Sequence, residues 1–394
     1  MYNFFKQTVF IFVITGILFI SVFTVAEIVA RKFYKKSNVM NPFFENHRHS
    51  DEKLIEIYKK NGHDWIDEFL DEYNKIEAAA DSFTYAPFRI YKFNSNINSK
   101  YINAKDGNRP TYVNVDNNCE DIKKIFILGG STIHGDGWLR DEDLINIQLG
   151  KIMKSQKHKC YEIYNRGSSG YNSTQNFIRF FENDISSNSI YIFFDGINDF
   201  MHNYYGNVEH LWQNEMAQFV KVYALKENTA VLFIKKILLR SKFFQFLDDK
   251  ILDKDEIINE NIGLKNIKIK KQKRMNDHCK KWSNRSSAIN EVVKKNGGKT
   301  FFIWQITVGK YKNIHPNDKK IENITQNAFN GIFEHYEDTR KMCVKSFKLK
   351  NIEMIDLPND LTPEKEMFFD FAHLLPYGNY LIAEQMYNVI KQEL

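Results

Sequence analysis

The sequence predicts an α/β protein in which a parallel sheet is covered by helices on both faces. From residue 123 onward, short apolar runs typical of buried strands alternate with longer segments of helical apolar spacing. Four glycine-rich or polar segments follow predicted strands, where open α/β sheets place their ligands. The 394 residues, 43% of them apolar and 26% charged, are enough to bury the core of such a sheet.

Charge and cysteine content narrow the classes of function. The formal net charge of +6 is small for this length, and no zinc-finger spacing or basic recognition helix is present, so nucleic acid is not an expected partner. The densest basic run, residues 265–274, is interpreted as a solvated loop or helix face, with attraction to anionic lipid or an acidic glycan as the alternative. A protein of this size does not need disulfides. We therefore expect ordinary cysteines, which do not identify the compartment, at Cys119, Cys160, Cys279 and Cys343.

Residues 8–26 contain no charged side chain and predict a transmembrane helix. At about 1.5 Å per residue they span roughly 28 Å, close to the hydrocarbon core of a bilayer. A cleaved signal peptide is the alternative, but this run exceeds the usual apolar region of about 7–15 residues. Arg31, Lys32, Lys35 and Lys36 follow the segment, and the positive-inside rule alone favours a cytoplasmic body. We nevertheless expect a single-pass cell-membrane protein with an extracytoplasmic body, because long domains translocate largely regardless of flanking charge.

Three regions follow from these patterns: an anchor, a connecting region that packs on the catalytic domain, and the catalytic domain, over residues 1–30, 31–120 and 121–394. In the connecting region, apolar spacing predicts a helix over residues 52–80 that Gly62 interrupts. Residues 83–112 are typical of loops with short strands.

In the catalytic domain the pattern alternates between strand and helix. The predicted strands are residues 123–128, 161–164, 189–194, 299–306 and 352–357. The predicted helices are residues 141–154, 173–185, 317–347 and 376–391. A helical insertion of about residues 200–298 separates the third strand from the fourth.

Four short segments lie at or just beyond the carboxyl ends of these strands. They are Gly129-Gly130-Ser131-Thr132, Asn165-Arg166-Gly167-Ser168-Ser169-Gly170, Asp195-Gly196-Ile197-Asn198-Asp199 and Asp370-Phe371-Ala372-His373. Each segment alone is ordinary turn chemistry. In a parallel sheet, however, the strand ends share one edge, so the four segments are expected to converge.

The residue types in these segments suit nucleophilic catalysis. Ser131 needs a base to take its proton, and His373 can be that base. Asp370 can hold the imidazole in the required tautomer and stabilise its charged form. Negative charge developing on an attacked carbonyl needs preorganised donors, which the backbone N–H groups of Ser131 and Gly170 and the Asn198 amide can supply.

These four segments resemble the signature blocks of the SGNH (GDSL-type) hydrolase superfamily, and the chain is similar to its membrane-anchored bacterial members. The resemblance covers residue 123 to the carboxyl terminus. It implies a three-layer α/β/α flavodoxin-like fold and serine-dependent chemistry on acyl esters without metal or cofactor. It places the triad at Ser131, Asp370 and His373 and the oxyanion hole at Ser131, Gly170 and Asn198. Within the glycine block it favours Gly170 for this role and leaves Gly167 to the turn.

Two departures from the family pattern bear on function. Gly130 stands where the eponymous motif has Asp, as in many membrane-tethered relatives, so we do not interpret it as a loss of activity. The insertion at about residues 200–298 is long and can form a lid or an acceptor site. It leaves the acyl group and the acceptor open.

The sequence therefore predicts a serine esterase that removes acyl groups, chiefly O-acetyl groups, from a glycan or lipid of the cell envelope. An O-acyltransferase that uses the same triad on a glycan acceptor is the main alternative, and a non-catalytic scaffold for envelope assembly is a remote one. A nucleotide-binding protein is disfavoured because Gly129–Gly137 lacks the Lys-Ser/Thr ending of a P-loop.

Two further positions are open to more than one interpretation. His134 follows the nucleophile by three residues, but we interpret it as a bystander in a helix, with no evident aspartate to orient it. Trp304 and Gln305 lie near the end of the fourth predicted strand, and pocket lining and ordinary packing are equally compatible with them.

Overall fold

The computed structural model describes residues 49–79, 83–86, 89–93, 96–182, 185–204, 264–311, 313–329, 331–357 and 363–394. Contacts divide the chain into two compact units, residues 1–43 with 216–269 and residues 44–215 with 270–394, and nearly all described residues belong to the second unit. The expected membrane segment, residues 8–26, lies outside the described residues, as do residues 205–263 of the expected insertion. Among the helices in the described ranges, none combines the length and the apolar character needed to cross a membrane.

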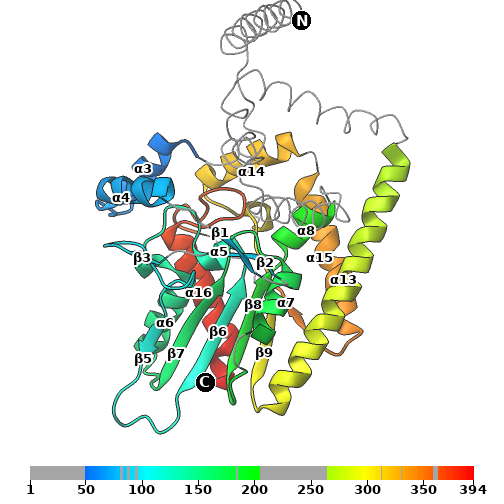
Figure 1. The fold of residues 1–394 in the computed structure, drawn as a ribbon. Coiled ribbons are helices and arrows are strands. Elements are labelled where there is room, and N and C mark those ends of the chain that lie inside the picture. Colours follow the sequence, from blue (N-terminus) through cyan, green and yellow to red (C-terminus); the bar gives the residue numbers. More distant parts are fainter. Residues whose placement is uncertain are drawn as a thin grey trace, which may run out of the picture. The chain divides into compact units, whose positions relative to one another are not determined.

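A six-stranded sheet forms the centre of the second unit, in the order β10-β9-β8-β6-β7-β5 (Figure 1). Its strands are β5 (Tyr112–Asn114), β6 (Lys123–Gly129), β7 (Tyr161–Gly167), β8 (Ile190–Asp195), β9 (Lys299–Trp304) and β10 (Met354–Ile355). All neighbouring pairs are parallel except β5 and β7, which are antiparallel. The prediction of a purely parallel sheet is therefore wrong at one edge, where residues from the expected connecting region add a strand.

The register of the central strands brings their carboxyl ends level. Gly129 at the end of β6 is paired with Gly167 of β7 on one side and with Phe194 of β8 on the other. Every residue of β8 is buried, as expected for a continuous apolar strand covered on both faces. The loops that follow β6, β7 and β8 consequently emerge at one edge of the sheet.

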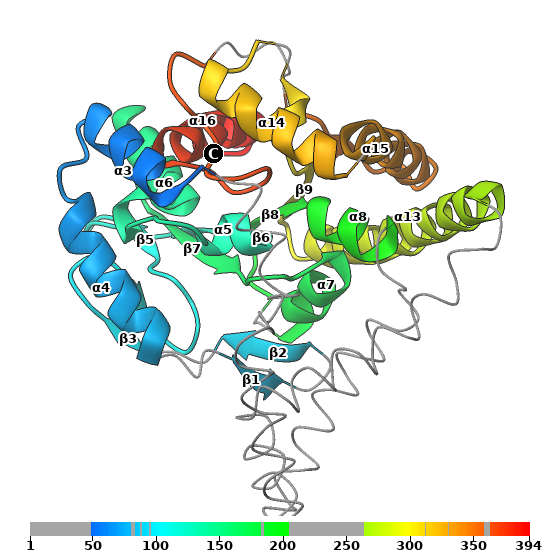
Figure 2. The ribbon, with the colours of Figure 1, turned by 90° about the horizontal axis from the view of Figure 1, so that it is seen from above.

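Helices cover both faces of this sheet, which confirms the predicted α/β class (Figure 2). Two helices, α6 (Ile145–Ser155) and α16 (Pro376–Ile390), lie on one face, and α7 (Ser173–Glu182) and α13 (Leu264–Lys295) lie on the other. The basic run at residues 265–274 forms the first part of α13. Just after β8, α8 (Ile197–Tyr204) begins the expected insertion.

Glycine separates two pairs of helices. The expected break at Gly62, where φ is 81°, divides α3 (Asp51–Lys60) from α4 (Ile66–Ala79). The single helix predicted over residues 317–347 is instead two helices, α14 (Pro316–Ala328) and α15 (Ile332–Lys348). Gly331 lies between them with φ of 73°, a left-handed conformation that glycine adopts without a steric penalty.

Apolar side chains from α3 and α4 pack against the catalytic half of the chain. One cluster joins Leu54 and Phe69 of these helices to Trp138, Phe369 and Leu375. Phe369 directly precedes Asp370, so this cluster fixes the base of the loop that carries the Asp-x-x-His segment. Residues before the sheet thereby help to place a segment near the end of the chain.

All four cysteines are paired in disulfides, Cys119–Cys160 and Cys279–Cys343, which corrects the expectation of ordinary cysteines. The pairs are 41 and 64 residues apart in the sequence, so local spacing gives no sign of them. The second disulfide joins α13 to α15. In the described ranges, the side chains close enough together to hold a metal ion are Asp116, Cys119 and Cys160, and the disulfide removes the two thiolates from that group.

Candidate active site

Ser131 is the first residue of α5 (Ser131–His134), a single helical turn that begins directly after β6 and Gly130. Glycines allow this turn to lie close to the sheet. A Cβ on Gly129 would lie 2.8 Å from the Phe194 carbonyl oxygen, and one on Gly167 would lie 2.2 Å from the His134 backbone nitrogen. The structure thus gives Gly167 a packing role at the end of β7, which differs from the turn role expected for it.

Ser131, His373 and Asp370 form a continuous hydrogen-bonded chain. The Ser131 Oγ lies 2.7 Å from Nε2 of His373, and Nδ1 of the same ring lies 2.6 Å from Oδ2 of Asp370. Asp370 is buried, at 2% exposure, while His373 is partly buried. The chain has the order nucleophile, base and orienting carboxylate that activates a serine hydroxyl.

The loop between β10 and α16 holds His373 in place through its own hydrogen bonds. Oδ1 of Asp370 accepts the backbone N–H groups of Ala372 and His373, both at 2.8 Å. The Phe369 N–H donates to the His373 carbonyl oxygen at 2.9 Å, which closes the loop. The Thr132 hydroxyl donates to the Ala372 carbonyl oxygen at 3.2 Å, so the residue after Ser131 is tied to the residue before His373.

The electrostatic environment favours the charged forms of both His373 and Asp370. Burial alone would lower the pKa of His373, but the charge and hydrogen bond of Asp370, together with the charge of Asp136, raise it to about 9. Burial opposes ionisation of Asp370, yet the charge of His373 and hydrogen bonds from His373 and Ala372 hold the carboxyl pKa below its usual range. The imidazolium form that proton transfer from Ser131 creates is therefore stabilised.

Besides Ser131, the predicted oxyanion residues are Asn198 and Gly170, and both are next to the Tyr171 backbone: Asn198 by a hydrogen bond and Gly170 in the chain. The Asn198 amide donates to the Tyr171 carbonyl oxygen at 2.8 Å. It also packs against the backbone before Ser131, because a Cβ on Gly130 would lie only 2.5 Å from Nδ2 of Asn198. Gly170 precedes Tyr171 and has φ of 73°, a conformation that favours glycine. A side-chain amide has two N–H groups, so Asn198 can keep the Tyr171 bond and donate to a ligand as well.

Asp136 is a residue of the site that the sequence interpretation missed. One carboxylate oxygen lies 2.6 Å from Nδ1 of His134, and the other accepts the Ser169 hydroxyl at 2.6 Å. His134 therefore has an aspartate partner, contrary to expectation, although the ring that contacts Ser131 belongs to His373. Burial opposes the ionisation of Asp136, but contacts with His134, the charge of His373 and the Ser169 bond hold its pKa below the usual range.

Asp136→Asn is expected to move the pH dependence of kcat/KM to lower pH. His373 accepts a proton only when neutral, so with its pKa raised to about 9, activity should rise with pH and level off above that value. Loss of the Asp136 charge removes one interaction that raises this pKa. Steady-state kcat/KM measured across the pH range tests the shift, and Asp338→Asn, the same chemical change at an exposed position, is the control. A profile identical to that of the wild type would contradict the electrostatic role of Asp136.

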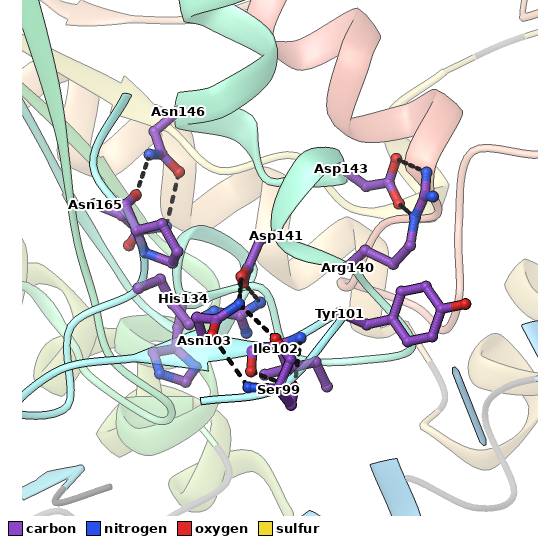
Figure 3. Close-up of polar contacts among 12 residues, drawn as sticks. Ser99, Tyr101, Ile102, Asn103, His134, Arg140, Asp141, Asp143, Asn146 and Asn165 are labelled. Carbon is purple, nitrogen blue, oxygen red and sulfur yellow. Dashed lines mark hydrogen bonds and ion pairs between the residues drawn. The ribbon is translucent and has the colours of Figure 1, made fainter. Parts of the chain in front are cut away.

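Buried amide side chains hold the serine turn, α5, in position. Nδ2 of Asn165 donates to the Ile133 carbonyl oxygen of α5 at 2.6 Å and to Oδ1 of Asn146 at 3.1 Å. Figure 3 shows Asn165 and Asn146. The same view shows the hydrogen bond that Nδ2 of Asn103 donates to Oδ2 of Asp141 at 2.8 Å. Asn165 opens the predicted glycine block, so its contribution is to position α5 rather than to contact a substrate.

A second buried network supports Asn198. The Ser173 hydroxyl donates to Oδ1 of Asp199 at 2.6 Å, and Nε2 of His278 lies 2.8 Å from the same oxygen. Burial opposes the ionisation of Asp199, but His278 and Ser173 hold its pKa below the usual range. Burial and the nearby charge of Asp199 raise the pKa of Asp195 well above its usual range. Because His278 lies on α13, the last helix of the expected insertion stabilises the start of α8, which carries Asn198.

Asp318 of α14 supports the loop that carries Asp370. Its carboxylate accepts the backbone N–H groups of Met367 and Phe368 at 2.9 and 3.3 Å. Burial raises the pKa of Asp318 to about 7, although these two bonds oppose the shift and Glu366 adds to it. Asp318 is completely buried, so its ionised form lacks solvation by water.

Replacement of Asp318 by Asn is expected to flatten the pH dependence of stability. A folded-state pKa near 7, above the unfolded value, gives a contribution that is complete below the unfolded pKa and is lost as the pH rises through 7. The variant should therefore lose less unfolding free energy than the wild type between about pH 4 and pH 7, by an amount on the order of a few kcal/mol. Urea unfolding at several pH values measures this difference. Equal slopes for both proteins would refute it.

No protein-family model matches the chain, and no curated protein matches it. Among solved structures, an acetyl xylan esterase, AlAXEase, is 15% identical, with 68% of this chain and 99% of that chain covered and a TM-score of 0.35. A protein described as a GDSL-like lipase from Parabacteroides merdae is 13% identical, with 70% and 98% covered and a TM-score of 0.38. Axe2, an acetylxylan esterase from Geobacillus stearothermophilus, is 9% identical, with 69% and 95% covered and a TM-score of 0.34. Structural similarity this low does not indicate a function, so the function has to be inferred from the geometry of the site.

Proposed function

We propose that the chain is a serine esterase of the SGNH type, in which Ser131 is the nucleophile, His373 the general base and Asp370 the orienting carboxylate. The observation that carries the proposal is the uninterrupted chain from the Ser131 Oγ to His373 at 2.7 Å and from His373 to Asp370 at 2.6 Å. It lies at the carboxyl edge of the sheet, where open α/β folds bind ligands.

The geometry supports a two-step acyl transfer. The Ser131 Oγ attacks the ester carbonyl carbon while its proton moves to Nε2 of His373. The oxyanion accepts hydrogen bonds from the backbone N–H groups of Ser131 and Gly170 and from the Asn198 amide. The alkoxide then leaves with the proton from His373, and the acyl group stays on Ser131. Water attacks this ester and gives a proton to His373; the bond between the acyl carbon and the Ser131 Oγ then breaks, His373 returns the proton to that Oγ, and the carboxylic acid is released.

Covalent labelling tests this proposal directly. A fluorophosphonate probe should label the wild-type protein at Ser131 and should not label Ser131→Ala, since the probe needs an activated serine. Ser155→Ala, which removes an exposed serine hydroxyl on α6, is the matched control and should still be labelled. A wild-type protein that resists the probe would overturn the proposal.

Substrate assays separate hydrolysis from transfer. We propose acyl esters, chiefly O-acetyl esters, of an envelope glycan or lipid as substrates. Release of acetate or fatty acid in water alone supports the esterase. Turnover that requires an added glycan acceptor would instead identify an O-acyltransferase with the same triad.

We also propose that the catalytic unit lies outside the cytoplasm and is tethered by the apolar segment at residues 8–26. Disulfides persist in oxidising compartments, and all four cysteines are paired, with Cys279 and Cys343 completely buried. The disulfides support this placement independently of the flanking positive charges, which favour the opposite orientation. Protease treatment of intact spheroplasts should degrade the catalytic unit, and a fully protected unit would contradict this placement.

A further inference from the structure

A cavity of about 200 Å³ with a mixed polar and apolar lining lies at the carboxyl end of β9. Its lining combines three aromatic side chains with three charged ones, namely Trp304, Phe333, Tyr336, Glu337, Arg340 and Asp356. Most of these residues lie on one face of α15, at the spacing of three and four residues that aligns side chains along a helix. The cavity is therefore built by regular structure rather than by a loose loop.

Two hydrogen bonds connect the cavity wall to the catalytic segments. Gln305 lines the cavity, and its Nε2 donates to the Thr132 hydroxyl at 2.8 Å, directly after Ser131. The Val308 N–H donates to the Phe371 carbonyl oxygen at 3.0 Å, within the loop that carries Asp370 and His373. A ligand in the cavity would therefore lie beside the segments that hold the nucleophile and the base.

The charges around the cavity define the chemistry of its ligand. The Arg340 guanidinium donates to Glu337 at 2.7 Å and lies 3.0 Å from Asp356. Glu337 and Asp356 neutralise the guanidinium, and Lys341 Nζ lies 3.9 Å from Glu337, so the rim carries no excess positive charge that would attract a phosphate or another anion. An acyl chain would also fit poorly, because it would strip water from these charged groups without replacing its hydrogen bonds. A neutral ligand with several hydroxyl groups satisfies both conditions.

The aromatic side of the cavity fits the same class of ligand. Trp304 is 2% exposed, and its indole N–H has no hydrogen-bond partner among the described residues. Trp304 is one of the lining residues, and a buried donor without a partner is costly, so a ligand oxygen that reached this N–H would gain from accepting it. The rings of Trp304 and Tyr336 pack against each other, with centroids 4.9 Å apart, and form the aromatic part of the lining. The volume is smaller than the range of about 300–1,000 Å³ that drug-sized ligands occupy.

We propose that this cavity binds one neutral sugar ring of the substrate, with Glu337 and Asp356 accepting its hydroxyl groups. The inference rests on the proposed function in one respect: the sugar would belong to the glycan whose acyl ester reaches Ser131. It names the substrate as a glycan rather than a lipid. The carboxylates are suited to this task because hydrogen bonds to ionised acceptors are stronger than bonds between neutral groups.

Binding to the Ser131→Ala protein tests the cavity without any catalysis. Chitotetraose, cellotetraose, xylotetraose and mannotetraose are titrated by calorimetry, with glycerol phosphate and hexanoate as the anionic and acyl comparisons. At least one tetrasaccharide should bind, and Glu337→Gln and Asp356→Asn should each weaken it roughly tenfold by loss of a charge-assisted bond. Asp338→Asn, an exposed carboxylate on the same helix, is the matched control and should change nothing. Circular dichroism establishes that each variant is folded.

The outcomes separate this inference from the proposed function. Failure of all four tetrasaccharides to bind, preference for glycerol phosphate or hexanoate, or equal affinity in Glu337→Gln and the control would each overturn the sugar site. Hydrolysis of 4-nitrophenyl acetate, which contains no sugar, reports the catalytic chain alone. If that ester is hydrolysed and no sugar binds, only the cavity inference fails. If a sugar binds and fluorophosphonate does not label the wild type, only the proposed catalysis fails.

Discussion

Asp370→Asn should lower kcat for a simple acetyl ester about ten-thousandfold while the protein stays folded. Oδ1 of Asp370 accepts the N–H groups of Ala372 and His373, and an asparagine oxygen can keep both bonds. The amide NH2 group would then replace Oδ2, which lies 2.6 Å from Nδ1 of His373. An amide donor at that position favours the tautomer with a proton on Nε2. Such a ring cannot accept the proton of Ser131.

Steady-state hydrolysis of 4-nitrophenyl acetate measures this effect, and thermal unfolding shows whether the fold is kept. Asp338→Asn makes the same chemical change at an exposed position on α15 and should leave kcat unaltered. If Asp370→Asn retains the wild-type rate, Asp370 is not the orienting carboxylate. A large loss of rate together with loss of cooperative unfolding would instead identify a structural defect in the loop.

The convergence of the site follows from topology that the sequence reveals. Ser131 and Asn198 follow the short apolar strands β6 and β8, the glycine block forms the end of β7 and the loop after it, and parallel strands end at a common edge. The register that pairs Gly129 with Gly167 and Phe194 brings these ends level. Strand type and order along the chain therefore suffice to predict that these residues meet, since the alternation of apolar strands and helices is strong throughout this region.

The sequence could not predict the pairing of distant strands and cysteines, because no local pattern specifies it. Strand β5 is only three residues long, and its antiparallel pairing with β7 depends on how the preceding loops pack. The disulfides join cysteines in separate elements. The partner of His134 was missed for a different reason: Gly135, with φ of 87°, ends α5 after one turn. The chain then reverses, so that Asp136 reaches both His134 and Ser169, whereas a longer helix would have carried it away.

Asn198→Ala should lower kcat about 100- to 1,000-fold with little change in KM, because an oxyanion donor acts mainly in the transition state. Its amide lies between the Tyr171 carbonyl oxygen, which accepts it at 2.8 Å, and the backbone before Ser131. The Tyr171 bond fixes the orientation of the amide before substrate arrives. Asn203→Ala removes an amide that donates to the Asp199 carbonyl oxygen within the same helix α8, and it serves as the control, with a much smaller effect expected on kcat.

Gly130→Ala should reproduce much of this loss through a steric effect on the same amide. Gly130 has φ of −81°, so alanine is compatible with the backbone, but its Cβ would lie 2.5 Å from Nδ2 of Asn198. The amide must move, and its donor is lost from the oxyanion hole. In the Asn198→Ala background that clash is absent and the milder 3.1 Å approach of the Cβ to the Tyr171 carbonyl oxygen remains, so adding Gly130→Ala should cost much less activity than it does in the wild type. Fully additive losses in the double variant would show that Gly130 acts on the serine turn by another route, which would separate its role from that of Asn198.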